Sequence, residues 1–139
     1  SGYTPEQVDE VYVTHMHADH VGGLTTAAGK AELVPGIRAL ATPGHTPGHA
    51  AYVVESQGRK LVLWGDLMQV AAVQFPDPAV TIQFDSDAKA AAPQRKKAYA
   101  DAARNGYFVA IAHVSFPGIG QLRPDGKGYR WLPANYTTK

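Results

Sequence analysis

All six histidines of this 139-residue chain fall in three short segments, and this clustering constrains the fold more than any other feature. The segments are THMHADH at 14–20, PGHTPGH at 43–49 and AHVSF at 112–116. Each follows a β-prone run, at Val11–Thr14, Ile37–Ala41 and Tyr107–Ala112. Polar residues that repeatedly follow strands gather at one edge of a sheet. We therefore predict a layered α/β domain whose site lies where these strands end.

Composition excludes several classes of protein. The chain has no cysteine, which excludes disulfides, thiolate ligands and cysteine nucleophiles. Thirteen Lys and Arg against twelve Asp and Glu give a formal charge of +1, which argues against a nucleic-acid partner, so the basic run at 94–97 is interpreted as a solvated helix face. No apolar run approaches the roughly 20 residues of a membrane helix, and the polar start SGYTPEQVDE is no signal peptide. We expect one domain over residues 1–139, with no membrane partner.

Turn and capping residues predict further elements. Thr4, Pro5 and Gln7 suit the start of a helix, and Gln57-Gly58 suits a hairpin turn. Trp64 and Phe75 are expected in the core. The predicted elements are a helix at 4–10, a hairpin of strands 50–55 and 60–64, a helix from caps at 85–87 to about 104 that contains Pro93, and a strand at 129–132.

The segment His15-x-His17-x-Asp19-His20 is the most specific signal for chemistry. Alternate residues of an extended segment point the same way, so His15 and His17 can grip one ion together. Asp19 and His20 lie one step further, where the chain turns, and can face a second ion. Imidazoles and carboxylates suit zinc and similar metals. Because small structural zinc sites usually use thiolates, this donor set favours hydrolytic work.

Two metals need more ligands, and three further residues follow predicted strands. His45, Asp66 and His113 should reach one rim of the sheet. Asp66 could bridge two metals through its two carboxylate oxygens, or it could cap the turn after its strand. His49 lies in a Gly-Pro turn and is expected to hydrogen-bond its loop. Ser115 lacks the G-x-S-x-G setting of a nucleophile.

Several segments together resemble the metallo-β-lactamase superfamily of metal hydrolases. They are THMHADHVGG, TPGHTPGH, LWGD and the strand before His113. Three more stretches are most similar to methyl-parathion-hydrolase-like enzymes, which resemble lactonases: VVESQGRKLVLWGDLMQVAAVQF, RKKAYADAA, and HVSFPGIG through GKGYRWLPANY. The resemblance implies an αββα sandwich. It also implies a ligand set of His15, His17 and His45 for one metal, Asp19, His20 and His113 for the other, and Asp66 as the bridge.

The chain is shorter than the pattern that it resembles. Fourteen residues precede His15, where the family begins with half of its sandwich. His20 and His45 are 25 positions apart, where relatives carry a long insertion, which would belong between Lys30 and Ala31. The sandwich is therefore expected to be incomplete or compacted, with one apolar sheet face lacking its partner. We expect either a homodimer or segments omitted from the sequence; relatives are often exported, which leaves a periplasmic or secreted location open.

The resulting hypothesis is a hydrolase with two divalent metals, zinc first, with manganese, cobalt and iron as alternatives. A hydroxide shared by the metals would attack an organophosphate triester such as methyl parathion, with Asp19 and Asp66 assisting. The alternatives are a lactonase or aryl esterase, and a fragment that binds metal without turnover. A redox member of the superfamily is less favoured because no flavin domain is present. Candidates for the substrate pocket, or alternatively for the core, are Phe84, Phe116 and Met68.

Overall fold

The computed structural model describes residues 4, 7–8, 11–15 and 32–137, and the structural statements below concern these residues. Predictions for His17, Asp19, His20 and the junction of Lys30 and Ala31 lie outside them. The described chain forms one sheet of seven strands in sequence order. The strands are β1 (Glu32–Val34), β2 (Ile37–Ala41), β3 (Ala50–Ser56), β4 (Arg59–Leu63), β5 (Phe108–Ala110), β6 (Ile119–Asp125) and β7 (Gly128–Pro133).

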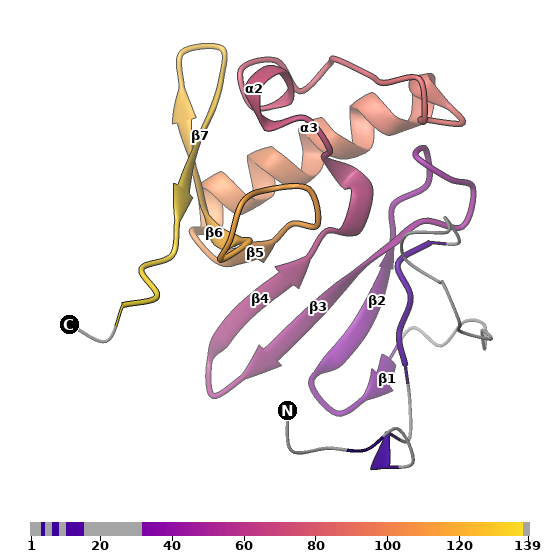
Figure 1. Cartoon of the computed structure of the whole chain (residues 1–139), viewed down its shortest axis with the longest axis vertical. Helices are drawn as coiled ribbons and strands as arrows, with labels where there is room; N and C mark the ends of the chain where they lie inside the picture. The colour runs from indigo at the N-terminus through magenta and orange to yellow at the C-terminus, as the bar shows by residue number, and fades with distance from the viewer. Residues whose placement is uncertain (1–3, 5–6, 9–10, 16–31, 138–139) are drawn as a thin grey trace.

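One parallel pair in this sheet determines which strand ends meet. Neighbouring strands are antiparallel except β4 and β5, where Leu61 pairs with Phe108 and Leu63 with Ala110. The crossover between them contains the 3-10 turn η2 (Gly65–Leu67) and the helices α2 (Ala71–Gln74) and α3 (Ala88–Asn105), as Figure 1 shows. Because β2 and β4 are both antiparallel to β3, strands β2, β4 and β5 run in one direction. Their carboxyl ends therefore lie at the same edge.

Local sequence explains the main hairpin and the long helix. Gln57 and Gly58 both have positive φ, 50° and 73°, which is the conformation of the tight turn between β3 and β4. The Asp87 carboxylate caps α3 by accepting from the backbone N–H groups of Lys89 and Ala90, an arrangement worth about 1 kcal/mol. Gly106 ends the helix in the left-handed conformation. The hairpin and the helix were both predicted, and α3 continues through Pro93.

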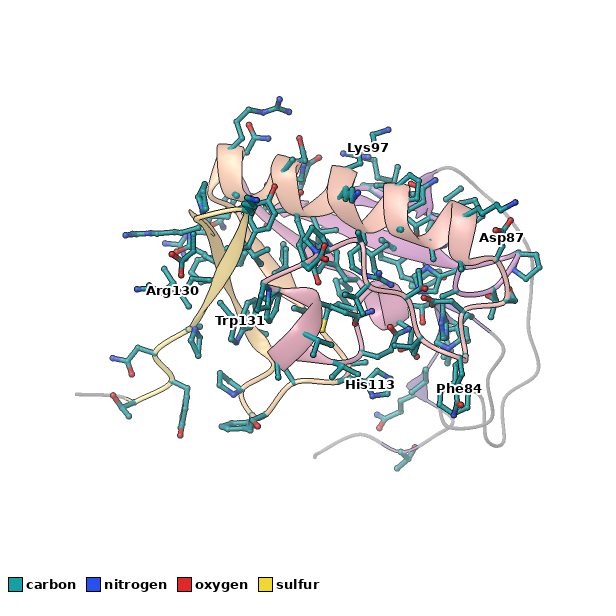
Figure 2. All side chains as sticks on the ribbon, turned by 90° about the horizontal axis from the view of Figure 1, so that it is seen from above. Phe84, Asp87, Lys97, His113, Arg130 and Trp131 are labelled. Carbon is teal, nitrogen blue, oxygen red and sulfur yellow. The ribbon has the colours of Figure 1, made fainter. Side chains whose placement is uncertain are left out.

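Helix α3 covers one face of the sheet and forms the core with it. Figure 2 shows the helix lying along the sheet. Trp64 stacks on Tyr99 of α3 with ring centroids 5.2 Å apart. The predictions that Trp64 and Phe75 are core residues are confirmed. The core comprises Ala51, Val53, Val62, Trp64, Leu67, Met68, Phe75, Tyr99, Ala102, Val109, Ile111 and Leu122.

The opposite face of the sheet is also apolar, but no described element covers it. Strand alternation and register place one row of side chains on this face, all of them half-buried or exposed. Phe108 is 43% exposed and Ile119 is 36% exposed. The row, named here the open face, consists of Ile37, Ala39, Tyr52, Val54, Leu61, Leu63, Phe108, Ala110 and Ile119. Tyr12 packs against Tyr52 of this row, and the Tyr52 hydroxyl donates to the Val13 carbonyl, but no described helix or strand lies over the rest of the row.

Three predicted elements differ from the structure. Val11–Thr14 was predicted as a strand, but its described residues are irregular: the Thr14 carbonyl accepts one bond from the Ala50 N–H, and no ladder continues from it among the described residues. The strand predicted at 107–112 is shortened to β5, because the chain turns toward His113. Of the helix predicted at 4–10, the structure describes residues 4, 7 and 8, and Gln7 has the 3-10 conformation. Strands β1 and β6 and helix α2 were not predicted. No helix among the described residues has the length and apolar character needed to cross a membrane.

The close approach of β6 and β7 yields a testable prediction. A Cβ at Gly120 would lie 2.3 Å from the Leu132 carbonyl oxygen, so a side chain there forces the hairpin apart. Gly120→Ala should lower the free energy of unfolding by roughly 1–3 kcal/mol, measured by urea denaturation. Gly48→Ala is the control, since no atom of the described residues lies within 4 Å of its Cβ position. Equal stability of the two variants would contradict this packing.

Candidate metal centre

The carboxyl ends of three strands bring the polar residues of the site together. His45 lies in the loop after β2, Asp66 in η2 after β4, and His113 in the turn after β5. His15, from the N-terminal segment, is buried beside them. The predicted convergence of these four residues on one sheet edge is therefore observed.

One carboxylate oxygen forms the centre of this group. The Oδ2 atom of Asp66 lies 3.0 Å from His113 Nε2, 3.3 Å from His45 Nε2 and 3.5 Å from His15 Nε2. Asp66 is 4% exposed, whereas the His113 side chain is 36% exposed. The carboxylate therefore faces histidines from both of the ligand sets that the resemblance implies.

This donor set fits a metal ion. Ligand atoms of His15, His45 and Asp66 all lie within 4.8 Å of one another, so these three residues could hold one ion. Three imidazole Nε2 atoms around a carboxylate are typical donors for zinc. His113 contacts the same carboxylate from the solvent-exposed side of the cluster, a position that suits a ligand of a second ion. His17, Asp19 and His20, the other predicted ligands, lie outside the described residues.

His49 is held by hydrogen bonds at both ring nitrogens. Its Nε2 accepts from the backbone N–H of Asp66 at 3.1 Å, so the proton lies on Nδ1, which donates to Thr42 Oγ1 at 2.7 Å. The ring is 1% exposed. His49 thus fastens the Asp66 turn to the loop after β2, which agrees with the structural role expected for it.

The three predicted pocket residues have different surroundings. Phe84 is 63% exposed and Phe116 is 78% exposed, and Phe116 packs edge-on against Tyr136 with centroids 4.8 Å apart. Figure 2 shows Phe84 and His113 toward the same side of the molecule, away from α3. Met68 is fully buried in the core. Met68 therefore packs beneath the site, and its expected contact with substrate is corrected to core packing.

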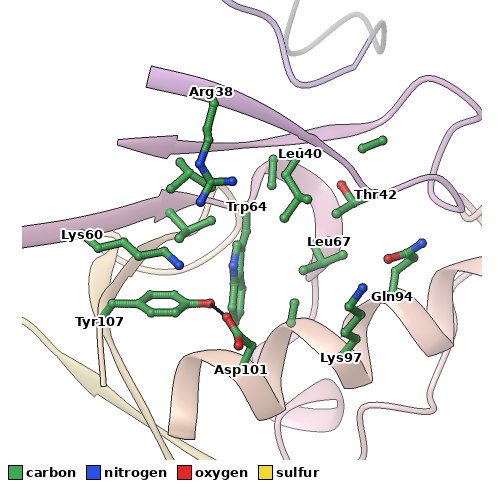
Figure 3. A pocket seen from close by; sticks show the side chains of 15 residues that line it. Arg38, Leu40, Thr42, Lys60, Trp64, Leu67, Gln94, Lys97, Asp101 and Tyr107 are labelled. Atoms are coloured by element: carbon green, nitrogen blue, oxygen red, sulfur yellow. Dashed lines mark hydrogen bonds between the residues drawn. The ribbon is translucent and has the colours of Figure 1, made fainter. Parts of the chain in front are cut away.

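A separate cavity of about 200 Å³ lies between the sheet and α3 (Figure 3). Its apolar walls include Leu40, Trp64 and Leu67, and its lining contains none of the site histidines. At its edge Tyr107 donates a hydrogen bond to Asp101. Burial alone would raise the pKa of Asp101, but the hydrogen bonds from Tyr107 and Arg104 and the nearby positive charges hold that pKa below its usual value.

Two buried residues behind the site were missed by the sequence analysis. Asp85 was interpreted as a helix cap and Arg95 as part of a solvated basic run. The Arg95 residue is 0% exposed, and the Asp85 side chain contacts His45. Helical spacing was the available signal, since Arg95 shares the buried face of α3 with Ala91, Tyr99 and Ala102.

Comparisons of the sequence connect this geometry with known proteins. The family model of the anti-Pycsar protein Apyc1 matches residues 1–39. An N-acyl homoserine lactonase of Bacillus cereus is 26% identical over 131 residues, which are 69% of this chain and 52% of the lactonase. An N-acyl homoserine lactonase of a Bacillus species is 25% identical over the same shares. The chain thus spans about half the length of these relatives. Because 131 positions exceed 69% of a 139-residue chain, the Bacillus cereus lactonase has residues inside the matched stretch without a counterpart here.

The fold is also similar to those of two solved structures. AidC, a dizinc quorum-quenching lactonase in complex with a product, has a TM-score of 0.72 and 27% identity, covering 76% of this chain and 36% of AidC. The hydrolase AbOPH of the beta lactamase superfamily has a TM-score of 0.71 and 39% identity, covering 75% of this chain and 36% of AbOPH. The chain therefore has part of the metallo-β-lactamase-like fold. Its homologues and structural neighbours with that fold are metal-dependent hydrolases.

The hydrogen bonds of His49 give a testable prediction for the site. His49→Ala removes the acceptor for a buried backbone N–H and the partner of Thr42, so the free energy of unfolding should fall by about 1–3 kcal/mol, measured by urea denaturation of metal-free protein. His113→Ala is the comparison, because His113 is partly exposed and should cost less. A stability of His49→Ala equal to that of the parent would contradict the role of His49 as the fastening of Asp66.

Proposed function

We propose that this chain carries the metal centre of a two-metal hydrolase that opens the ester bond of lactones, with N-acyl homoserine lactones as the substrate class. The observation that carries the proposal is the single Asp66 oxygen within 3.5 Å of three imidazole nitrogens. The named relatives support the substrate class, because both are N-acyl homoserine lactonases. AidC, described as dizinc, supports zinc as the metal.

The proposed ligands extend the described group by the residues that the resemblance assigns. One ion would be held by His15, His17 and His45, and the other by Asp19, His20 and His113. Asp66 would bridge them, and its position between His45 and His113 supports this assignment. Divalent metals in such a site polarise the ester carbonyl and lower the pKa of a coordinated water toward neutrality.

The protein's own contribution is to aim the donors before any metal arrives. The Nδ1 atom of His15 contacts Thr14 Oγ1 at 3.0 Å, and Nδ1 of His45 contacts the Asp85 carboxylate at 3.1 Å. Each ring therefore turns its Nε2 toward Asp66. His49 fixes the backbone of Asp66 from behind. Because Asp85 and His49 are buried and Thr14 is half-buried, the donors hold their positions without rearrangement, which favours metal binding.

The organophosphate hypothesis keeps the same centre but has less support. Either a carbonyl carbon or a phosphorus atom can be attacked in such a site, and the exposed rings of Phe84 and Phe116 suit an acyl chain as well as an aryl group. The named curated relatives are lactonases, and AbOPH is described only as a hydrolase. We therefore place lactones first and phosphotriesters second.

The open face also belongs in this proposal. Large apolar patches on stable proteins usually mark interfaces. AidC and AbOPH each match this chain over 36% of their length, so each has more fold than is present here. We propose that a second sheet, supplied by the further chain that such relatives have, packs on the open face. A homodimer through this face is the alternative occupant.

Metal removal and replacement of the bridge test the centre. Protein stripped with a chelator and reloaded should contain two zinc ions per chain by elemental analysis. Asp66→Ala should bind fewer and lose most lactone turnover, because the shared ligand is gone. The control is Asp125→Asn, an exposed acid that pairs with Arg130 at the surface. Two zinc ions and full turnover in Asp66→Ala would refute the bridging role.

Substrate preference tests the exposed aromatic residues. Phe84→Ala and Phe116→Ala should each change the ratio of kcat/KM for a lactone and for paraoxon by roughly tenfold, with unchanged zinc content, because each removes apolar contact area beside the centre. Phe108→Ala, on the open face, is the matched control. If the ratio is constant in all three variants, the substrate binds elsewhere.

A further inference from the structure

Asp85 and Arg95 form a buried ion pair behind the candidate centre. Asp85 contacts His45, and Arg95 contacts the turn that carries Asp66. Asp85 lies in the loop before α3, and Arg95 lies in the second turn of α3 and beyond the reach of solvent. Their side chains are 0% and 1% exposed. Removing two charges from water costs free energy, which offsets much of their attraction. A gain in stability therefore does not explain why this pair is buried here.

Asp85 faces His45 on the side away from Asp66. Its Oδ1 atom lies 3.1 Å from His45 Nδ1. Its Oδ2 atom accepts from the Ile82 N–H at 3.2 Å and from Arg95 Nη2 at 3.4 Å. A carboxylate oxygen can only accept, so the contact with His45 requires the proton on Nδ1. That tautomer leaves the Nε2 lone pair directed at Asp66 and at a metal.

Arg95 joins this arrangement to the turn that carries Asp66. Its Nε donates to the Leu67 carbonyl at 2.7 Å, one residue after Asp66. Its Nη1 donates to the Pro78 and Val80 carbonyls, which holds the loop between α2 and α3. One guanidinium therefore contacts the Asp66 turn directly and His45 through Asp85.

We infer that Asp85 and Arg95 are positioning residues: Asp85 fixes the tautomer and orientation of the His45 ring, and Arg95 locks Asp85 and the Asp66 turn in register. The consequence for metal binding rests on the proposed function. The consequence for the ring of His45 does not, because it follows from the hydrogen bonds alone.

Gln69 is the competing partner of the same ring nitrogen. Its Nε2 lies 2.9 Å from His45 Nδ1 and also donates to the Asp66 carbonyl. If this amide held the ring by donating to Nδ1, the imidazole proton would lie on Nε2. The two partners thus predict opposite tautomers, which can be distinguished by measurement.

The decisive variant is Asp85→Asn, which keeps the size of the side chain. The donors Ile82 N–H and Arg95 Nη2 face the position of Oδ2, so the new amide must place its oxygen there and its NH₂ toward His45. The ring must then accept at Nδ1 and carry its proton on Nε2, the atom that a metal needs. Asp101→Asn is the matched control, since Asp101 accepts from Tyr107 and Arg104 and contacts no site histidine in the described structure.

The experiment reads the ring and the metal separately on the full chain. Long-range ¹H–¹⁵N spectra of histidine-labelled, metal-free protein report the tautomer of His45, and competition with a chelator reports zinc affinity. The parent and Asp101→Asn should show the proton on Nδ1. Asp85→Asn should show it on Nε2 and bind zinc about 10–100-fold more weakly. Arg95→Lys keeps the charge but loses the planar fork of donors. Its His45 tautomer population and its zinc affinity should be intermediate between those of the parent and Asp85→Asn.

Each outcome decides the inference. A parent protein with the His45 proton on Nε2, or an Asp85→Asn variant with unchanged tautomer and zinc affinity and only a lower unfolding midpoint, overturns it. If Asp85→Asn does not fold, unchanged readouts in Arg95→Lys overturn it equally. A parent that binds no zinc, but whose His45 tautomer depends on Asp85, refutes the metal proposal and leaves the positioning role standing.

Discussion

The structure depends on one buried carboxylate oxygen surrounded by imidazoles. Asp66 Oδ2 lies within 3.5 Å of histidines from three separate segments of the chain. Burying a carboxylate is costly unless polar partners compensate, so every segment that supplies one must be held in place. His49 holds Asp66 itself, and the Asp85–Arg95 pair lies behind His45. The loops at this sheet edge are therefore defined by the polar cluster that they enclose.

The topology brings residues that are distant in the sequence together in this cluster. Strands β2, β4 and β5 run in one direction, so the loops that follow them meet at one edge. The crossover that makes β4 and β5 parallel also contains α3. That helix covers the core with Tyr99 and Ala102 and supplies Arg95 to the region behind the site. A single helix thus links the packing of the core to the alignment of the candidate ligands.

The two faces of the sheet differ in a way that fits the comparisons. One face is covered by α3, whereas no described helix or strand covers the other face, where Phe108 and Ile119 are partly exposed. Structural neighbours with the same fold have more chain than is matched here. Apolar side chains on a sheet face favour contact with a second layer. The asymmetry therefore supports the proposal that a second layer packs on the open face.

The sequence by itself predicted the main hairpin, the long helix and the candidate donors. Turn and cap residues at 57–58 and 85–87 predicted the hairpin and the start of α3, because these conformations depend on few neighbouring residues. Strand-following histidines predicted where the site would lie. Only the tertiary structure decided which groups stand behind the donors. Arg95 looks like a surface residue in sequence, yet folding buries it, because its partners Asp85 and Leu67 come from other loops. Met68 lies outside any helix or strand, so no periodic pattern showed that its side chain packs in the core.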